Sequence, residues 1–386
     1  MIADMHCHYP MHLLEDDEHP HGAMAGWLQD LADSLRAEAL GIVAHLVNDP
    51  RLSAGWRVDL DGLVAGQVGL VCSVLYWPAG EFRIGTRPAG NAFADLQGLL
   101  ARVESDLHEL DPTNQRHVIV GAQSAPVDDG RVNFVHCVEG GFNLGPDRDA
   151  IGDNVKWLAD RGILYITVAH LFFQGVATNA PAIPLFTDWE YNRIFREPLG
   201  VGLTDLGKDL VRAMYEHKIL VDISHMSEQA IDDTFDLIEA LDRETGRAAT
   251  GYPVLATHVG MRSENRDTQV YNLTPKTVQR IKDRGGLIGV IMAQHQLGST
   301  ADAAQSQATV ARHLKAIAAA CGGGFDSCAI GSDLDGFIKP TLAGLETAPD
   351  FRTVAGWIDA EFSAADAEKI RYQNAAALVR RIFAAR

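Results

Sequence analysis

Residues 204–227 read TDLGKDLVRAMYEHKILVDISHMS, and this stretch contains the pattern that decides the fold. An amphipathic segment over 208–217 is followed directly by a short apolar run over 219–223, which leads into a serine and a histidine. Thr204 and Ser227 suit the N-caps of the helices before and after that run, because a hydroxyl accepts backbone N–H groups of a first helical turn. The stretch therefore predicts a helix, a buried parallel strand and a second helix.

Seven further short apolar runs alternate with amphipathic stretches along the chain, which is typical of a parallel sheet built from strand–helix units. Eight such units predict a single (β/α)8 barrel over residues 1–386, although the length alone suggests two or three domains. The C-terminal helical region is expected over 363–385, with Ser363 as its N-cap. The seven runs are 1–7, 68–76, 132–138, 163–169, 254–257, 287–292 and 327–330, with 117–121 as a candidate edge strand and helices at 26–40, at 91–107 and after Asn272-Leu273-Thr274-Pro275.

The composition excludes several classes of protein. The 386 residues carry 33 Lys+Arg and 51 Asp+Glu, and the resulting net charge of −18 disfavours binding to nucleic acid or to an anionic membrane. Five scattered cysteines without a C-x-x-C pair argue against a disulfide framework and a cysteine zinc site. The chain starts without a basic segment and an apolar run, and no apolar run approaches the ~20 residues of a membrane span. We therefore expect a cytoplasmic protein.

Histidines and carboxylates stand where most of the predicted strands end. In a barrel the carboxyl ends of the strands meet at one rim, so side chains far apart in the sequence share one site there. His6 and His8 are two residues apart in a strand and face the same side. The candidates that follow strands are His6, His8, Glu139, His170, His225, His258 and Asp333.

These residue types are those of a metal centre. Neutral histidine nitrogen and carboxylate oxygen suit Zn²⁺ and similar ions. Glu139 has two oxygens, which could bridge two ions about 3.5–4 Å apart, as in two-metal hydrolases. A hydroxide held between the ions would then be the nucleophile, and Asp333 the general acid and base. We expect two divalent ions, with Zn²⁺ favoured.

The motifs resemble the membrane (renal) dipeptidase family of the amidohydrolase superfamily. The resemblance covers most of the chain and implies a metal-dependent barrel that hydrolyses dipeptides. It rests on Asp4-Met5-His6, Val138-Glu139-Gly140-Gly141, Tyr165-Ile166-Thr167-Val168-Ala169-His170, Leu203-Thr204-Asp205-Leu206-Gly207, Asp222-Ile223-Ser224-His225-Met226-Ser227, Ala256-Thr257-His258 and Ile330-Gly331-Ser332-Asp333-Leu334-Asp335-Gly336.

Carried over by position, the resemblance implies a role for each candidate. His6 and His8 would hold one metal, and His225 and His258 the other. Glu139 would bridge the two ions. The resemblance further implies that His170 polarises the scissile carbonyl and that Asp333 shuttles the proton.

Two positions depart from the family pattern. His8 stands where the family usually carries aspartate, which removes one negative charge from the site. Tyr271 stands where the family places an arginine for the terminal carboxylate of the substrate. Arg262 or Arg266 could supply that cation, although both could equally be solvated loop residues. His295 follows the seventh strand and is a further candidate for the pocket wall.

Three hypotheses on function follow. The first is a metal-dependent hydrolase that cleaves the amide bond of a dipeptide or a small peptide-like substrate. The second keeps the metal centre but changes the substrate to a non-peptide amide, lactam or ester in a specialised pathway. The third is a non-catalytic barrel that serves as a binding protein. The sequence leaves the oligomeric state open, with a homodimer as one option.

Overall fold

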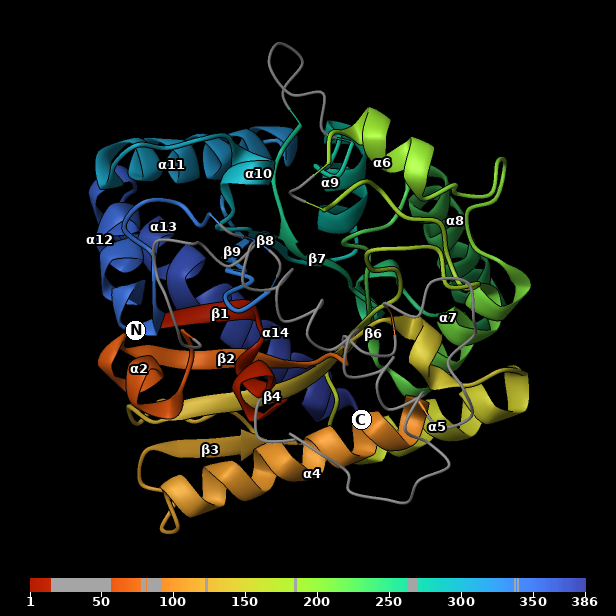
Figure 1. Ribbon diagram of the computed structural model, residues 1–386, viewed down its shortest axis with the longest axis horizontal. Helices are drawn as coiled ribbons and strands as arrows, with labels where there is room; N and C mark the ends of the chain where they lie inside the picture. The colour runs from red at the N-terminus through yellow and green to blue at the C-terminus, as the bar shows by residue number, and fades with distance from the viewer. Residues whose placement is uncertain are drawn as a thin grey trace, which may run out of the picture.

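Eight parallel strands form a nearly closed barrel in the computed structural model, with the helices in a ring around them (Figure 1). Each strand pairs with the next one along the chain, apart from β3, which pairs with β4 outside this path. The predicted barrel and all eight predicted strands are confirmed, and 117–121 forms the expected edge strand. The strands are β1 (Ile2–Cys7), β2 (Val68–Leu75), β3 (His117–Val120), β4 (Val132–Glu139), β5 (Tyr165–Thr167), β6 (Leu220–Asp222), β7 (Val254–Val259), β8 (Ile288–Val290) and β9 (Cys328–Ile330).

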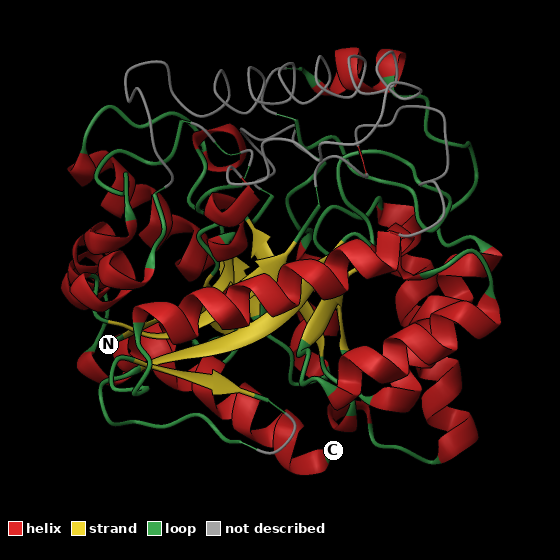
Figure 2. Cartoon of the chain, turned by 60° about the horizontal axis from the view of Figure 1, so that its bottom comes forward, coloured by secondary structure: helices red, strands yellow, loops and turns green. Residues whose placement is uncertain are grey.

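The structure describes residues 1–14, 57–77, 81, 92–121, 124–183, 186–262, 270–336, 338 and 340–386. The helix predicted over 26–40 lies outside these residues. Figure 2 shows the strands enclosed between the helices. The helices are α2 (Leu60–Ala65), α4 (Ala92–Leu110), α5 (Arg148–Asp160), α6 (Asp188–Ile194), α7 (Asp205–His217), α8 (Glu228–Thr245), α9 (Pro275–Asp283), α10 (Gln294–Leu297), α11 (Ala303–Ala320), α12 (Phe351–Glu361), α13 (Ala364–Glu368) and α14 (Asn374–Ala385), with the π-helical turn η5 (Lys369–Gln373) between the last two.

The predicted helix starts are confirmed by their caps. The side chains of Thr204, Ser227 and Ser363 accept the backbone N–H groups of Gly207, Ala230 and Asp366, each three residues further on. Thr274 caps α9 in the same way, and Pro275 takes the first helical position, where no N–H group is needed. These caps fix where each helix begins after its loop.

The first and last strands of the barrel meet through main-chain hydrogen bonds just beyond their carboxyl ends. The Asp333 N–H donates to the His6 carbonyl at 2.8 Å, and the His8 N–H donates to the Leu334 carbonyl at 2.9 Å. The buried Asp4 carboxylate accepts the Ser332 N–H at 2.7 Å and the Ser332 hydroxyl at 2.5 Å. The first and last strands of the barrel, β1 and β9, are therefore joined beside the predicted site.

The C-terminal helix lies at the opposite end of the barrel. The Arg386 Nη2 donates to the carbonyls of Lys218 at 2.9 Å and Leu164 at 3.4 Å, and the Arg381 Nη2 donates to the Gly285 carbonyl at 2.7 Å. These three carbonyls precede β6, β5 and β8, so α14 covers the amino ends of the strands. Active sites of such barrels lie at the carboxyl ends, away from this helix.

Two expectations from composition can be compared with the structure. All five cysteines are buried and unpaired, as their scattered positions predict. Among the described helices, none has the length and apolar character needed to cross a bilayer. The cytoplasmic location stays a prediction.

Candidate metal centre

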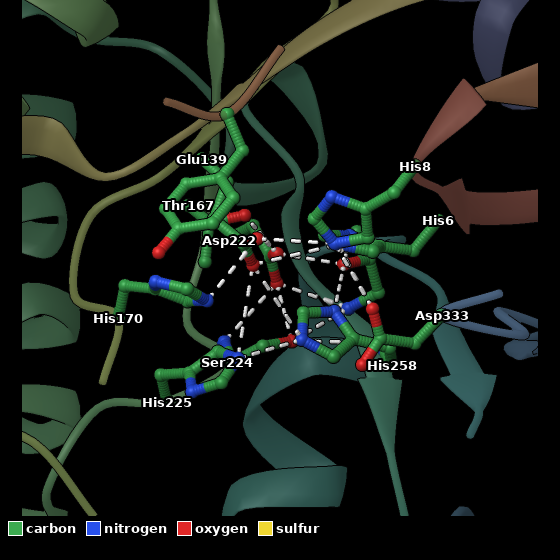
Figure 3. A network of polar contacts seen from close by, with 12 residues as sticks. His6, His8, Glu139, Thr167, His170, Asp222, Ser224, His225, His258 and Asp333 are labelled. Atoms are coloured by element: carbon green, nitrogen blue, oxygen red, sulfur yellow. Dashed lines mark hydrogen bonds and ion pairs between the residues drawn. The ribbon is translucent and has the colours of Figure 1, made fainter. Parts of the chain in front are cut away.

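The five predicted metal ligands converge on one point at the carboxyl ends of the strands (Figure 3). Glu139, at the end of β4, lies at the centre. Its Oε1 is 3.4 Å from the His6 Nε2 and 3.7 Å from the Nε2 atoms of both His225 and His258. Its Oε2 is 3.3 Å from the His8 Nε2. Two triads with metal-ligand spacing share Glu139, one with His6 and His8 and one with His225 and His258.

Several of these atoms are buried without a hydrogen-bond partner among the described residues. Both Glu139 oxygens and the His6 Nε2 lack such a partner. Burying a polar atom without a hydrogen bond destabilises the fold unless a bound ligand interacts with that atom. The Nε2 atoms of His225 and His258 are only 2.9 Å apart, so at most one of them can carry a proton toward the other. Four imidazoles and one carboxylate therefore offer lone pairs to a common centre, which fits two divalent ions.

The charges in the centre are strongly coupled. Burial alone would raise the pKa of Glu139, but His170, His6 and His8 outweigh it and hold that pKa well below its usual value. Burial, reinforced by neighbouring histidines, lowers the pKa values of His225 and His258 well below the ordinary range. The ionised Glu139 carboxylate and the neutral imidazoles of His225 and His258 are in the states in which these groups bind metal.

His170, the predicted electrophile, follows β5 and faces the same centre. Its Nε2 lies 3.3 Å from the Glu139 Oε2, and its Nδ1 lies 2.5 Å from the Oε2 of the fully buried Glu81. Burial would lower the pKa of His170, but the carboxylates of Glu139 and Glu81 outweigh it and raise that pKa to about 9. Tyr76 donates its hydroxyl to the same Glu81 oxygen at 2.7 Å. Glu81 follows no strand directly, so the pattern of strand ends does not predict it.

Asp333, the predicted acid and base, follows β9 and contacts the first metal triad. Its Oδ1 lies 3.0 Å from the His8 Nε2 and 3.8 Å from the His6 Nε2. The backbone of Asp333 has a φ of 59° and that of His225 a φ of 66°, in the left-handed region that residues other than glycine rarely adopt. Such strained conformations cluster at functional sites, where they aim side chains.

A small cavity opens beside these residues, with about 280 Å³ of free space that is partly open to solvent. Tyr271 lines it and donates its hydroxyl to the His258 carbonyl at 2.9 Å. Gln296 also lines it, and its buried Oε1 has no hydrogen-bond partner among the described residues. The lining residues are His8, His170, Leu171, Ala182, His225, Tyr271, Gln296, Asp333 and Ile338.

Two other candidates for substrate binding, Arg262 and His295, are not among these lining residues. The Arg262 guanidinium pairs with Glu228 and donates to the carbonyls of Val270 at 2.6 Å and Asn272 at 3.1 Å. His295 stands on α10 next to the lining residue Gln296. Arg266 lies outside the described residues. A role in substrate binding for Arg262, Arg266 and His295 therefore stays a prediction.

Comparison with known proteins identifies the family. The model of the membrane dipeptidase family, peptidase family M19, matches residues 2–385. The chain belongs to the membrane dipeptidase family. This confirms the resemblance that the sequence motifs indicate, and it places the barrel and its candidate metal sites within a family of metallodipeptidases.

Individual relatives of this membrane dipeptidase family member are distant. The chain is 32% identical over 179 residues to an uncharacterized protein in the pqqA 5′ region of Klebsiella pneumoniae, covering 46% of this chain and 55% of that protein. It is 26% identical over 222 residues to the dipeptidase tcpJ of Claviceps purpurea, covering 57% and 45%. Each match thus spans about half of the relative's length.

Two solved structures show the same fold. A metallo peptidase from Rhodobacter sphaeroides, liganded with a phosphinate mimic of the dipeptide L-Ala-D-Ala, matches with a TM-score of 0.68 and 17% identity over 98% of each chain. The probable dipeptidase PvdM from Pseudomonas aeruginosa matches with a TM-score of 0.61 and 18% identity, covering 86% of this chain and 90% of that one.

Proposed function

We propose that this chain hydrolyses the amide bond of a dipeptide or a small peptide-like molecule with the help of two divalent ions, Zn²⁺ being favoured. The observation that carries the proposal is the convergence of His6, His8, His225 and His258 on the unpartnered oxygens of buried Glu139. Two comparisons support the substrate class. The Rhodobacter relative is liganded with a dipeptide mimic, and the Claviceps relative is a dipeptidase.

The position of each residue indicates its role in the reaction. The four histidines and Glu139 would hold the ions, which when bound would lower the pKa of a water molecule and so supply a nucleophile at neutral pH. Asp333 lines the cavity and holds a carboxylate oxygen at the edge of the centre, where it can take a proton from water and return it to the leaving amine. The His170 Nε2 faces the cavity and can stabilise the oxygen of the carbonyl under attack.

A second candidate keeps the reaction but replaces the dipeptide by a non-peptide amide, lactam or ester. The observation that favours it is the cavity wall, in which the described residues include no lysine or arginine. Arg262 is engaged with Glu228 and two carbonyls. A substrate with a free carboxylate would need a cation from elsewhere, whereas a neutral substrate would not.

The experiment combines metal analysis with a substrate panel. We expect one to two ions per purified chain after reconstitution with Zn²⁺, and hydrolysis of some L,L or L,D dipeptides in the loaded protein. The panel also contains capped dipeptides without a free carboxylate, a lactam and an ester. The Asp333→Asn variant is the control, because it should retain the metal and lose hydrolysis.

The outcomes separate the candidates. Absence of metal after reconstitution would contradict both hydrolase hypotheses and favour the non-catalytic barrel. Bound metal with hydrolysis of the lactam or the ester, but of neither the free nor the capped dipeptides, would favour the second candidate. Hydrolysis that persists at the wild-type rate in Asp333→Asn would show that the proton is moved by another group.

A further inference from the structure

The hydroxyl of Thr257 lies between two of the candidate metal ligands. Its Oγ1 is 3.0 Å from the Nδ1 of His6 and 2.9 Å from the Nδ1 of His258. The two imidazole rings lie against each other, with their centroids 3.7 Å apart (Figure 3). His6 belongs to one metal triad and His258 to the other, so one hydroxyl contacts a ligand from each half of the centre.

Behind this hydroxyl stands the fully buried carboxylate of Asp222, at the end of β6. Its Oδ2 accepts the hydroxyls of Thr257 and Thr167, both at 2.7 Å. Its Oδ1 accepts the Ser224 hydroxyl at 2.8 Å, the Ser224 N–H at 3.1 Å and the Thr257 N–H at 2.9 Å. Five donors therefore occupy the two oxygens of a carboxylate, which can only accept hydrogen bonds.

These hydrogen bonds also indicate whether Asp222 is a metal ligand or a residue that supports the ligands. It lies within ligand distance of His6 and His258, in a third group with metal-ligand spacing. Its lone pairs are already taken by the five donors, whereas those of Glu139 are free. Asp222 is therefore a support for the ligands and not a ligand itself.

The positions of the protons follow from counting donors. A hydroxyl has one proton, and the Thr257 hydroxyl gives it to Asp222. Its oxygen can then only accept from the two Nδ1 atoms. The Tyr165 hydroxyl, 3.0 Å from the His6 Nδ1, donates to the Met5 carbonyl at 2.8 Å and can likewise only accept from His6. Both imidazoles must therefore carry a proton on Nδ1, which leaves the Nε2 lone pairs directed at the metal positions.

We propose that Thr257, supported by Asp222, is a positioning residue that fixes the metal-binding tautomer of His6 and His258 together. Outer partners of this kind orient ligand imidazoles and raise their basicity. The proposal rests on the proposed function only in requiring that the centre binds metal, and it holds whichever amide is the substrate. Its specific consequence is that one hydroxyl controls ligands of both ions.

The test is metal retention in competition with a chelator, measured on the zinc-loaded full chain. Thr257→Val removes the hydroxyl at nearly constant shape, and we expect both ions to be held about 10–100-fold more weakly. Thr257→Ser keeps the hydroxyl and should retain wild-type affinity. Thr167→Val is the matched control, because Thr167 donates to the same Asp222 oxygen at the same distance and contacts neither imidazole in the described structure.

Three outcomes overturn the proposal: equal losses in Thr257→Val and Thr167→Val, a loss confined to one ion, or an affinity in Thr257→Val that matches wild type. Asp222→Asn gives a second route if Thr257→Val does not fold. In this variant the amide N–H can donate to the Thr257 hydroxyl, which would then donate to an imidazole Nδ1 instead of accepting from it. We therefore expect this variant to retain metal more weakly as well, and wild-type metal affinity would contradict the proposal. A wild-type chain without metal would instead refute the proposed function.

Discussion

Each oxygen of the Glu81 carboxylate has two donors, although the residue is fully buried. Oε2 contacts the His170 Nδ1 and the Tyr76 hydroxyl, and Oε1 accepts the N–H groups of Leu171 at 2.9 Å and Phe172 at 3.3 Å. The carboxylate therefore holds both the ring of His170 and the main chain that follows it. Because the Nδ1 is occupied in this way, only the Nε2 is left to face Glu139 and the cavity.

We expect Glu81→Gln to lower kcat by about 10-fold or more while the metal content stays unchanged, because a neutral amide orients the His170 ring less firmly. Glu81→Asp should recover part of the loss. Steady-state kinetics on protein with verified metal content gives the measurement. Gln174→Leu is the control, since the Gln174 side chain donates to the main-chain carbonyl of Glu81 at 3.0 Å and not to its carboxylate. A wild-type kcat in Glu81→Gln would show that Glu81 does not position His170.

The residues of the site differ in how far the sequence predicts their positions. His6, Glu139 and His258 could be predicted as neighbours, because each ends a strand and all the strand ends meet at one rim. Glu81 could not, because it follows no predicted strand and reaches His170 only through the tertiary fold. Asp222 and Thr257 were visible as motif residues, but their hydrogen bonds depend on the register between neighbouring strands.

At the scale of elements, one face of strand β4 contributes a side chain to the site, and the other face packs in the core. Glu139 points into the centre, so His136, three residues earlier, points to the opposite face of the strand. His136 is buried, and neither of its ring nitrogens has a hydrogen-bond partner among the described residues. Burial, with a smaller contribution from Arg161, lowers the pKa of His136 to about 4.

This shift predicts how stability depends on pH. The unfolded chain binds a proton at His136 below about pH 6.5, whereas the folded protein resists protonation until about pH 4. The free energy of unfolding therefore falls as the pH drops through this window, by up to about 3 kcal/mol from this residue alone. His136→Leu should make that pH dependence shallower in urea unfolding with chelator present.

The exposed His108 on α4 provides the control for His136. His108→Leu should leave the pH dependence of the free energy of unfolding as in wild type. An unchanged slope between pH 6.5 and 4 in His136→Leu would mean that the buried imidazole is protonated in the fold. The apolar run of β4 predicted a buried strand, but the sequence did not show that its buried His136 has no hydrogen-bond partner among the described residues.

On the scale of the whole molecule, one end of the barrel contains the site and the other is covered by the C-terminal helix. The carboxyl ends of the strands carry the candidate metal centre, and there β1 and β9 are joined through Asp4 and Ser332. The amino ends are covered by α14, whose inner face buries Leu378, Val379 and Ile382. The eight-unit pattern predicted the barrel, but closure depends on contacts between the first and last strands, which are more than 300 residues apart in sequence.

This division predicts that the C-terminal helix stabilises the barrel without shaping the centre. Leu378 on α14 is 3% exposed, and Leu378→Ala should lower the free energy of unfolding by about 2–5 kcal/mol, because it removes buried contacts and leaves a cavity. Leu110→Ala is the matched control, since that side chain is 47% exposed and should cost much less. Urea unfolding measures both variants. Zinc content and kcat at 25 °C should stay at wild-type values in each, and a loss of zinc in folded Leu378→Ala would mean that the two ends of the barrel are coupled.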